Sequence, residues 1–201
     1  MPELAITREV GRDRGFLARA GERCLDLVNT VAWRLDPSRR QDRLPDDAAA
    51  LAWATAFGVC TEEEAALLAA QSTGALSAEL RSTREHVHAA VIDGDPEGAN
   101  ALLELDRDWW GRVELERADG SWRTRERFVD HRSVALRLGH EAVRILLEEP
   151  APVKQCADEA CGWIYLDTSP RRNRRWCSAE DCGAKNRSRD HYRRTRRSPR
   201  S

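Results

Sequence analysis

The chain has 201 residues, of which 41% are hydrophobic and 33% are charged, and its formal net charge is −1. This composition is typical of a folded protein with one or two domains, and no run of about 18 apolar residues is present that could cross a bilayer. The N-terminus, MPELAITREVGRDRG, lacks the apolar segment of a signal peptide, so we expect a cytoplasmic protein with reduced cysteines.

The first three quarters of the chain read as mostly helical. The first apolar stripe follows helical spacing at Cys24, Leu27, Val28 and Val31. A second helix is predicted over 48–57, where Asp46 or Asp47 could cap its start and Gly58 would end it.

Start and stop signals continue along the chain. Thr61 and Glu64 have the spacing of a capping box, which predicts a helix to about Ser72. Two further helices are predicted over 75–92 and 97–109. The helical part of the chain is therefore expected to hold several short, capped helices.

The hydrophobic period then changes from helical to strand-like. Residues 112–128 read as a β-hairpin around the Asp119-Gly120 turn. Residues 131–147 return to helical spacing, and prolines at 150 and 152 suggest a boundary. We therefore expect a mainly α domain with one β-hairpin over 1–150 and a second unit over 151–201.

Four cysteines near the C-terminus form the pattern C-x4-C-x15-C-x4-C: Cys156, Cys161, Cys177 and Cys182. Two such pairs can supply four thiolates to one tetrahedral zinc ion, and an all-cysteine shell indicates a structural rather than a catalytic zinc. The x4 spacing does not fit the redox motif C-x-x-C. About fifty residues bury little core, so we expect this unit to be disordered without metal.

The sequence between and after the pairs suggests how this unit folds. Residues 163–166 are strand-like, 169–173 form a turn, and 175–176 return to the metal. Ser178 stands three residues before Asp181, which predicts a helix start that carries Cys182 in its first turn. The order knuckle, hairpin, helix predicts a treble-clef-like zinc module.

These motifs resemble a known family. The segment that starts at Cys156 resembles the CGNR zinc finger of bacterial regulators. It contains the motifs C-G-W-I-Y-L-D-T-S, R-R-W-C-S and C-G-A-K-N-R-S-R-D-H-Y. The upstream motif C-L-D-L-V-N-T, which starts at Cys24, resembles the opening of the ABATE domain that usually precedes it. The resemblance implies a stress-responsive transcription regulator. Ala184 and Lys185 stand where the family has Asn and Arg, so the charge is kept at Lys185 whereas Ala184 lacks the side-chain amide.

The charge is distributed unevenly between the two units. Residues 151–201 carry 13 Lys and Arg against 6 Asp and Glu, whereas residues 1–150 carry 20 against 28. A basic end on an acidic body indicates a polyanionic partner, and arginine suits both phosphates and guanine edges. We expect DNA contacts from the turn and from the last helix: Arg171, Arg172, Arg174, Arg175, Lys185, Arg187, Arg189, Arg193, Arg194, Arg196 and Arg197. The alternative is a solvated basic tail that binds nothing.

The remaining polar and aromatic residues give weaker signals. Asp26, Asn29 and Trp33 could line a ligand pocket, although a structural role is favoured for Asp26 and Asn29. Trp109, Trp110 and Trp122 are expected to pack around the hairpin, and aromatic residues also line small-ligand pockets. Cys24 and Cys60 are expected in the core. No catalytic motif is recognised.

The sequence thus favours a zinc-binding, DNA-binding transcription regulator that is not an enzyme. The helical domain would sense a small-molecule effector or mediate assembly, for example as a homodimer. One alternative is that the zinc module is a clip for protein interactions, including docking on the acidic domain. Another is that the helical domain is a small-molecule enzyme with the zinc module as an accessory.

Overall fold

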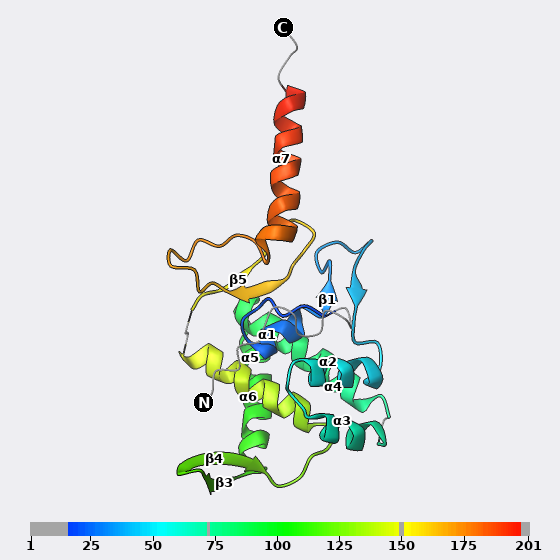
Figure 1. Cartoon of the computed structure of the whole chain (residues 1–201), viewed down its shortest axis with the longest axis vertical. Coiled ribbons are helices and arrows are strands. Elements are labelled where there is room, and N and C mark those ends of the chain that lie inside the picture. Colours follow the sequence, from blue (N-terminus) through cyan, green and yellow to red (C-terminus); the bar gives the residue numbers. More distant parts are fainter. Residues whose placement is uncertain (1–15, 72, 149–150, 198–201) are drawn as a thin grey trace.

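The structure is a computed structural model, and it describes residues 16–71, 73–148 and 151–197. Its body is mostly helical, as expected (Figure 1). In chain order, the helices of the body are α1 (Arg23–Val28), α2 (Asp47–Ala56), α3 (Glu62–Ala69), α4 (Ala75–His88), the short π-helix η2 (Ala89–Asp93), α5 (Pro96–Trp110) and α6 (Ser133–Glu148).

Helix α6 lies at the centre of this body and packs against α1, α4 and α5. Its Leu138 is fully buried, as is Leu102 on α5. The two helices cross closely at Gly139, where an added Cβ would stand 2.5 Å from the Cβ of Leu105. Any larger residue at this position would therefore push α5 away from α6.

The capping signals are found where the sequence predicts them. The side chain of Asp46 accepts a hydrogen bond from the backbone N–H of Ala49 and caps α2. Thr61 and Glu64 form the complete capping box of α3. Asp47 instead accepts hydrogen bonds at the start of α4, where the backbone N–H of Ser77 lies 2.7 Å from its carboxylate.

Two predicted helices are shorter than the sequence suggests. Helix α1 ends at Val28, and Val31 belongs to strand β1 (Val31–Ala32) instead of continuing the helical stripe. The reason is that the Asn29 side chain bonds to a distant strand, while the Thr30 hydroxyl donates to the Leu27 carbonyl. Helix α3 ends at Ala69, before the expected limit near Ser72, which is itself outside the described residues.

Two hairpins project from the body. Strand β1 pairs antiparallel with β2 (Gln41–Asp42). Strand β3 (Val113–Ala118) pairs with β4 (Ser121–Glu126) through the predicted turn, in which Asp119 and Gly120 have φ of 50° and 79°. Positive φ at both central residues is the geometry of a type I′ turn, which explains the Asp-Gly sequence.

The last part of the chain forms the zinc module. Its elements are β5 (Val153–Gln155), β6 (Ile164–Leu166), the short π-helix η3 (Ala179–Gly183) and helix α7 (Ala184–Arg197). The partner of β6 is β5, which precedes the first cysteine, and not the returning segment at 175–176. That segment contacts the first knuckle through a hydrogen bond from the Ala157 N–H to the Arg175 carbonyl.

The zinc module packs on the body through β6. Ile164 and Leu166 belong to the same hydrophobic core as α1 and α6. Leu166 also donates its backbone N–H to the Ala20 carbonyl at 2.8 Å. The expected boundary at Pro150 falls outside the described residues.

Figure 1 shows the module at one end of the molecule, the β3–β4 hairpin at the opposite end, and α7 projecting beyond the body. Within the described residues, every helix is too short or too polar to span a lipid bilayer.

Candidate metal centre and nucleic-acid surface

The four predicted cysteines converge on one point. The sulfur atoms of Cys156, Cys161, Cys177 and Cys182 all lie within 4.8 Å of one another. Cys177 Sγ is 3.8 Å from Cys161 Sγ and 3.6 Å from Cys182 Sγ. Four sulfurs at about 2.3 Å from a tetrahedral zinc stand about 3.8 Å apart, so the cluster has the size that zinc requires. These cysteines hold one structural zinc ion.

The first cysteine pair sits on a tight knuckle. The N–H of Cys156 donates to the Trp163 carbonyl at 2.7 Å, and the N–H of Cys161 donates to the Asp158 carbonyl at 3.1 Å. Gly162 follows with φ of 70°, and an added Cβ would stand 2.8 Å from the Arg34 Cβ. Contacts among the four thiols lower the pKa of Cys156 and raise the pKa of Cys161 and of Cys177, so the four thiols titrate as one cluster.

The second pair is organised by the predicted helix start. The Ser178 hydroxyl accepts a hydrogen bond from the Asp181 N–H at 3.1 Å, which begins η3 and places Cys182 in its only turn. The N–H of Gly183 then bonds back to the Ser178 carbonyl at 2.9 Å. Helix α7 starts directly afterwards, so its direction is fixed by the metal site.

Asp158 anchors α7 to the first knuckle. Its side chain has no exposed surface and accepts a 2.7 Å hydrogen bond from the amide of Asn186. Lys185 and Arg189 lie 3.5 and 3.9 Å from the same carboxylate. Burial opposes ionisation, but the Asn186 hydrogen bond, the Ala160 N–H and the two cations together lower the pKa of Asp158. The carboxylate therefore stays charged and holds the helix base.

A second buried carboxylate shapes the turn at 167–175. Asp167 has no exposed surface and accepts hydrogen bonds from Ser169, from the Arg174 N–H and from Lys154. Despite burial, these bonds hold the pKa of Asp167 well below its usual range. The turn that carries Arg171 and Arg172 is therefore fixed from inside.

Arg174 serves the same loop rather than the surface. Its guanidinium stacks 3.9 Å from the ring of Tyr165 and donates to the carbonyls of Trp176 and Cys177. Tyr165 donates in return to the Arg174 carbonyl at 2.8 Å, and burial raises the pKa of Tyr165 to about 12.

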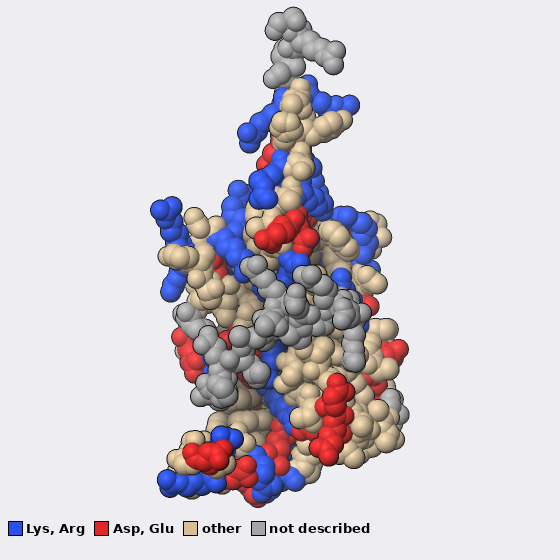
Figure 2. All heavy atoms as spheres, viewed as in Figure 1, with Lys and Arg blue, Asp and Glu red and all other residues tan. Residues whose placement is uncertain are grey.

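The predicted nucleic-acid residues thus fall into two groups. Lys185 and Arg189 have acidic partners, and Arg174 and Arg187 donate to carbonyls, so these four hold the module together. The others have no ion-pair partner among the described residues: Arg171, Arg172, Arg175, Arg193, Arg194 and Arg196. The Arg197 side chain lies outside the described part of the chain. Figure 2 shows blue side chains along α7 and around its base.

The predicted pocket residues are each engaged elsewhere. Asn29 bonds through both ends of its amide to the backbone of Ile164, at 2.8 and 2.9 Å. Asp26 accepts the N–H groups of Arg19 and Ala20, and burial raises its pKa to about 7. The Trp33 ring is in contact with two cations, Arg39 and Lys185. The ligand pocket at these residues stays a prediction that their geometry does not favour.

Aromatic residues surround a different cavity, between the β3–β4 hairpin and helices α5 and α6. Its volume is about 980 Å³, and its lining includes Trp109, Trp110, Trp122 and His140. Trp109 stacks on His140 with ring centroids 3.8 Å apart. Trp110 and Trp122 keep 52% and 64% of their surface exposed.

Cys24 and Cys60 are buried free thiols, as expected.

The sequence interpretation missed the anchors of the site. Asp158, Asp167 and Asn186 position the knuckle, the turn and α7, yet none was singled out. A usable signal existed for Asp158, because an acidic residue between two paired cysteines stands beside a metal knuckle. In this chain the side-chain amide that bonds to the first knuckle belongs to Asn186, two positions after Ala184, and its partner is Asp158.

Two family descriptions match the sequence. Residues 21–153 match ABATE, described as "Putative stress-induced transcription regulator". Residues 153–195 match the CGNR zinc finger. No curated protein matches the chain. The resemblance noted from the sequence motifs is thereby confirmed over most of the chain.

Proposed function

Because the chain belongs to the ABATE family and ends in a CGNR zinc finger, we propose that it is a zinc-binding regulator whose zinc module binds DNA. The helical body and the zinc module would then be two functional units, divided near Pro150. The body would receive a signal or mediate assembly, and the module would make the nucleic-acid contact.

One observation carries this proposal, namely the uneven pairing of cations. Most described arginines of the body are paired with carboxylates even when partly exposed, as Arg112 is with Asp130 and Arg137 is with Glu64 and Glu126. Arginines of the turn at 171–175 and of α7 beyond Arg189 lack such partners among the described residues. Unpaired guanidinium groups gathered at one end are available to phosphates.

The shape of α7 supports the same partner. The helix is polar all round, it packs against η3 at its base, and Figure 1 shows the rest projecting into open space. A helix with no apolar stripe has little to offer a hydrophobic protein surface. Its 14 residues extend about 21 Å, and its diameter of about 10–12 Å suits a DNA major groove about 12 Å wide.

The mechanism follows from this arrangement. Zinc closes the two cysteine pairs, the closed knuckle presents Asp158, and Asp158 with Asn186 holds the base of α7. The unpaired arginines of α7 and of the turn then replace counterions on the phosphates. Binding energy from counterion release falls as salt rises, with a slope of log K against log salt of about −0.9 for each phosphate neutralised.

The test is a fluorescence-anisotropy titration of labelled duplex DNA with the zinc-loaded full chain at several salt concentrations. The double variant Arg193→Ala/Arg194→Ala removes two unpaired cations from α7 and is expected to reduce the salt slope by about 2. The matched control, Arg123→Ala/Arg125→Ala, removes two cations that are paired on β4. Binding that is absent, independent of salt, or equally affected by both variants would refute the proposal.

A sensing role for the body is a second element of the proposal. The aromatic cavity beside the β3–β4 hairpin supports it, since exposed tryptophan faces can stack on a flat small molecule. Quenching of tryptophan fluorescence by a metabolite pool, abolished by Trp122→Ala, is the expected result. The body would alternatively mediate assembly as a homodimer, which sedimentation of the full chain would detect.

The interaction-clip alternative also has an observation in its favour. The module docks on the body of its own chain through β6, Asn29 and the salt bridge of 2.6 Å between Arg19 and Asp181. Figure 1 shows α7 projecting away from the body, so this docking leaves the unpaired arginines of α7 accessible. Neither matched family is described as enzymatic, which supports a regulator over an enzyme.

A further inference from the structure

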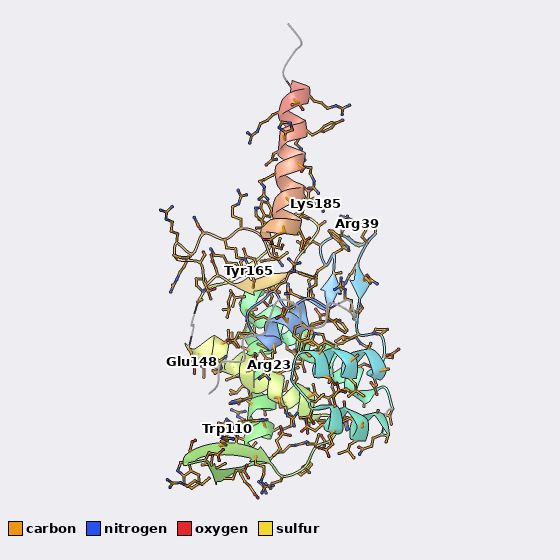
Figure 3. The ribbon with its side chains drawn as sticks, in the orientation of Figure 1. Arg23, Arg39, Trp110, Glu148, Tyr165 and Lys185 are labelled. Atoms are coloured by element: carbon orange, nitrogen blue, oxygen red, sulfur yellow. The ribbon has the colours of Figure 1, made fainter. Side chains whose placement is uncertain are left out.

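The loop between β1 and β2 of the body lies beside the base of α7. Figure 1 shows this loop on one side of the helix base and the turn at 167–175 on the other. In Figure 3 the labelled Arg39 and Lys185 lie close together, although they are far apart in the sequence. The body therefore contributes to the surface around α7.

Three contacts fix this loop to the zinc module. The Trp163 indole N–H donates to the Val31 carbonyl at 3.0 Å, and the N–H of Arg34 donates to the carbonyl of the zinc ligand Cys161 at 3.0 Å. Gly162 allows this approach, because a side chain there would collide with Arg34. The loop and the knuckle are thus held as one unit.

The third contact is a stack of charges on an aromatic ring. The Arg39 guanidinium lies 4.3 Å from the centroid of the Trp33 ring, and the Lys185 ammonium lies 4.6 Å from it. Two cations on one ring repel each other less when an anion lies near them. Trp33 has φ of 53°, an uncommon conformation for a bulky residue that marks a constrained position.

The charges of the loop are partly free. Arg39 pairs with Asp36 at 2.6 Å, whereas Arg40 is exposed and has no ion-pair partner among the described residues. Outside the zinc module, most other described arginines are paired to a carboxylate. Arg40 directly follows Arg39 in the chain and thus adds an unpaired guanidinium group to the loop that contacts the module.

We infer that the loop at 33–40 belongs to the nucleic-acid surface, with Arg40 as a phosphate-binding residue, and that the partner is duplex DNA. In this arrangement α7 lies in the major groove, Arg40 contacts one flanking backbone, and Arg171 and Arg172 contact the other. Duplex RNA does not fit, because its major groove is too deep and narrow for a helix. This inference rests on the proposed function.

The experiment compares Arg40→Ala with Arg117→Ala in the zinc-loaded full chain. Arg117 is also exposed, lacks an ion-pair partner among the described residues and lies on the β3–β4 hairpin at the other end of the molecule, so both variants remove one positive charge. Arg40→Ala is expected to reduce the DNA salt slope by about 1. The ratio of the wild-type affinity to the Arg40→Ala affinity should therefore fall about 3.5-fold between 50 and 200 mM salt. Arg117→Ala should match wild type.

Each outcome is decisive. If the wild type binds DNA and Arg40→Ala binds with the same slope as Arg117→Ala, this inference fails and the proposed function stands. If the wild type binds no duplex DNA, the proposed function fails and the inference fails with it. If duplex RNA of the same length binds as tightly as DNA, insertion into the major groove is wrong. Circular dichroism of both variants shows that the fold is retained.

Discussion

Asn29 joins the helical body to the zinc module through its side-chain amide. Oδ1 accepts the N–H of Ile164 at 2.8 Å, and Nδ2 donates to the Ile164 carbonyl at 2.9 Å. Asn29 is 4% exposed and Ile164 is not exposed at all, so water cannot replace these bonds. The substitution Asn29→Ala leaves two buried backbone groups without partners, at about 1–3 kcal/mol each. We expect the free energy of unfolding to fall by about 2–6 kcal/mol.

The measurement is urea denaturation of the zinc-loaded protein, followed by tryptophan fluorescence. Asn173→Ala is the matched control, because Asn173 is exposed on the turn and its loss should change stability by less than about 0.5 kcal/mol. Asn29→Asp separates hydrogen bonding from packing, since it keeps the volume but sets a carboxylate oxygen against the Ile164 carbonyl. It should destabilise the protein at pH 7. A loss below about 1 kcal/mol in both Asn29 variants would refute this account of the junction.

Three further predictions concern the buried acids and the metal. Burial raises the pKa of Asp26 to about 7, so the folded state favours its protonated form. The free energy of unfolding of wild type relative to Asp26→Asn should therefore fall by about 4 kcal/mol as pH rises from about 4 to about 7. A stability difference that does not change with pH would contradict the assignment. Asp158→Ala removes the charged partner of Asn186, and a hydrogen bond to a charged group is worth about 1.5–3 kcal/mol. Backbone amide exchange in the first turns of α7 should therefore accelerate about 10- to 100-fold while zinc stays bound. Cys161→Ser, or a chelator, should release one zinc per chain and unfold the module, because zinc supplies roughly 10–16 kcal/mol of coupled folding energy. Retained helicity of α7 after zinc release would argue against this prediction.

Local patterns allowed much of the fold to be predicted. The capping box at Thr61, the Asp-Gly turn and the Ser178 helix start depend on residues within a few positions of each other, and all three form as expected. The error at Val31 has the opposite origin. Helical spacing continues there, but Asn29 bonds to a strand 135 residues away and the helix stops.

The sequence alone determined the metal site, because the spacing within each cysteine pair confines both thiolates to one tight turn and four such thiolates suit only a closed tetrahedral shell. It also determined that the positive charge gathers at this end. Only the tertiary structure decided which of these cations are free. Lys185 and Arg189 are paired with acidic residues more than 25 positions away, and Arg174 is held by carbonyls. The loop that carries Arg40 reaches the base of α7 because Arg34 and Trp33 contact the module. Charge pairing depends on distances in space, and those distances are set when the core packs.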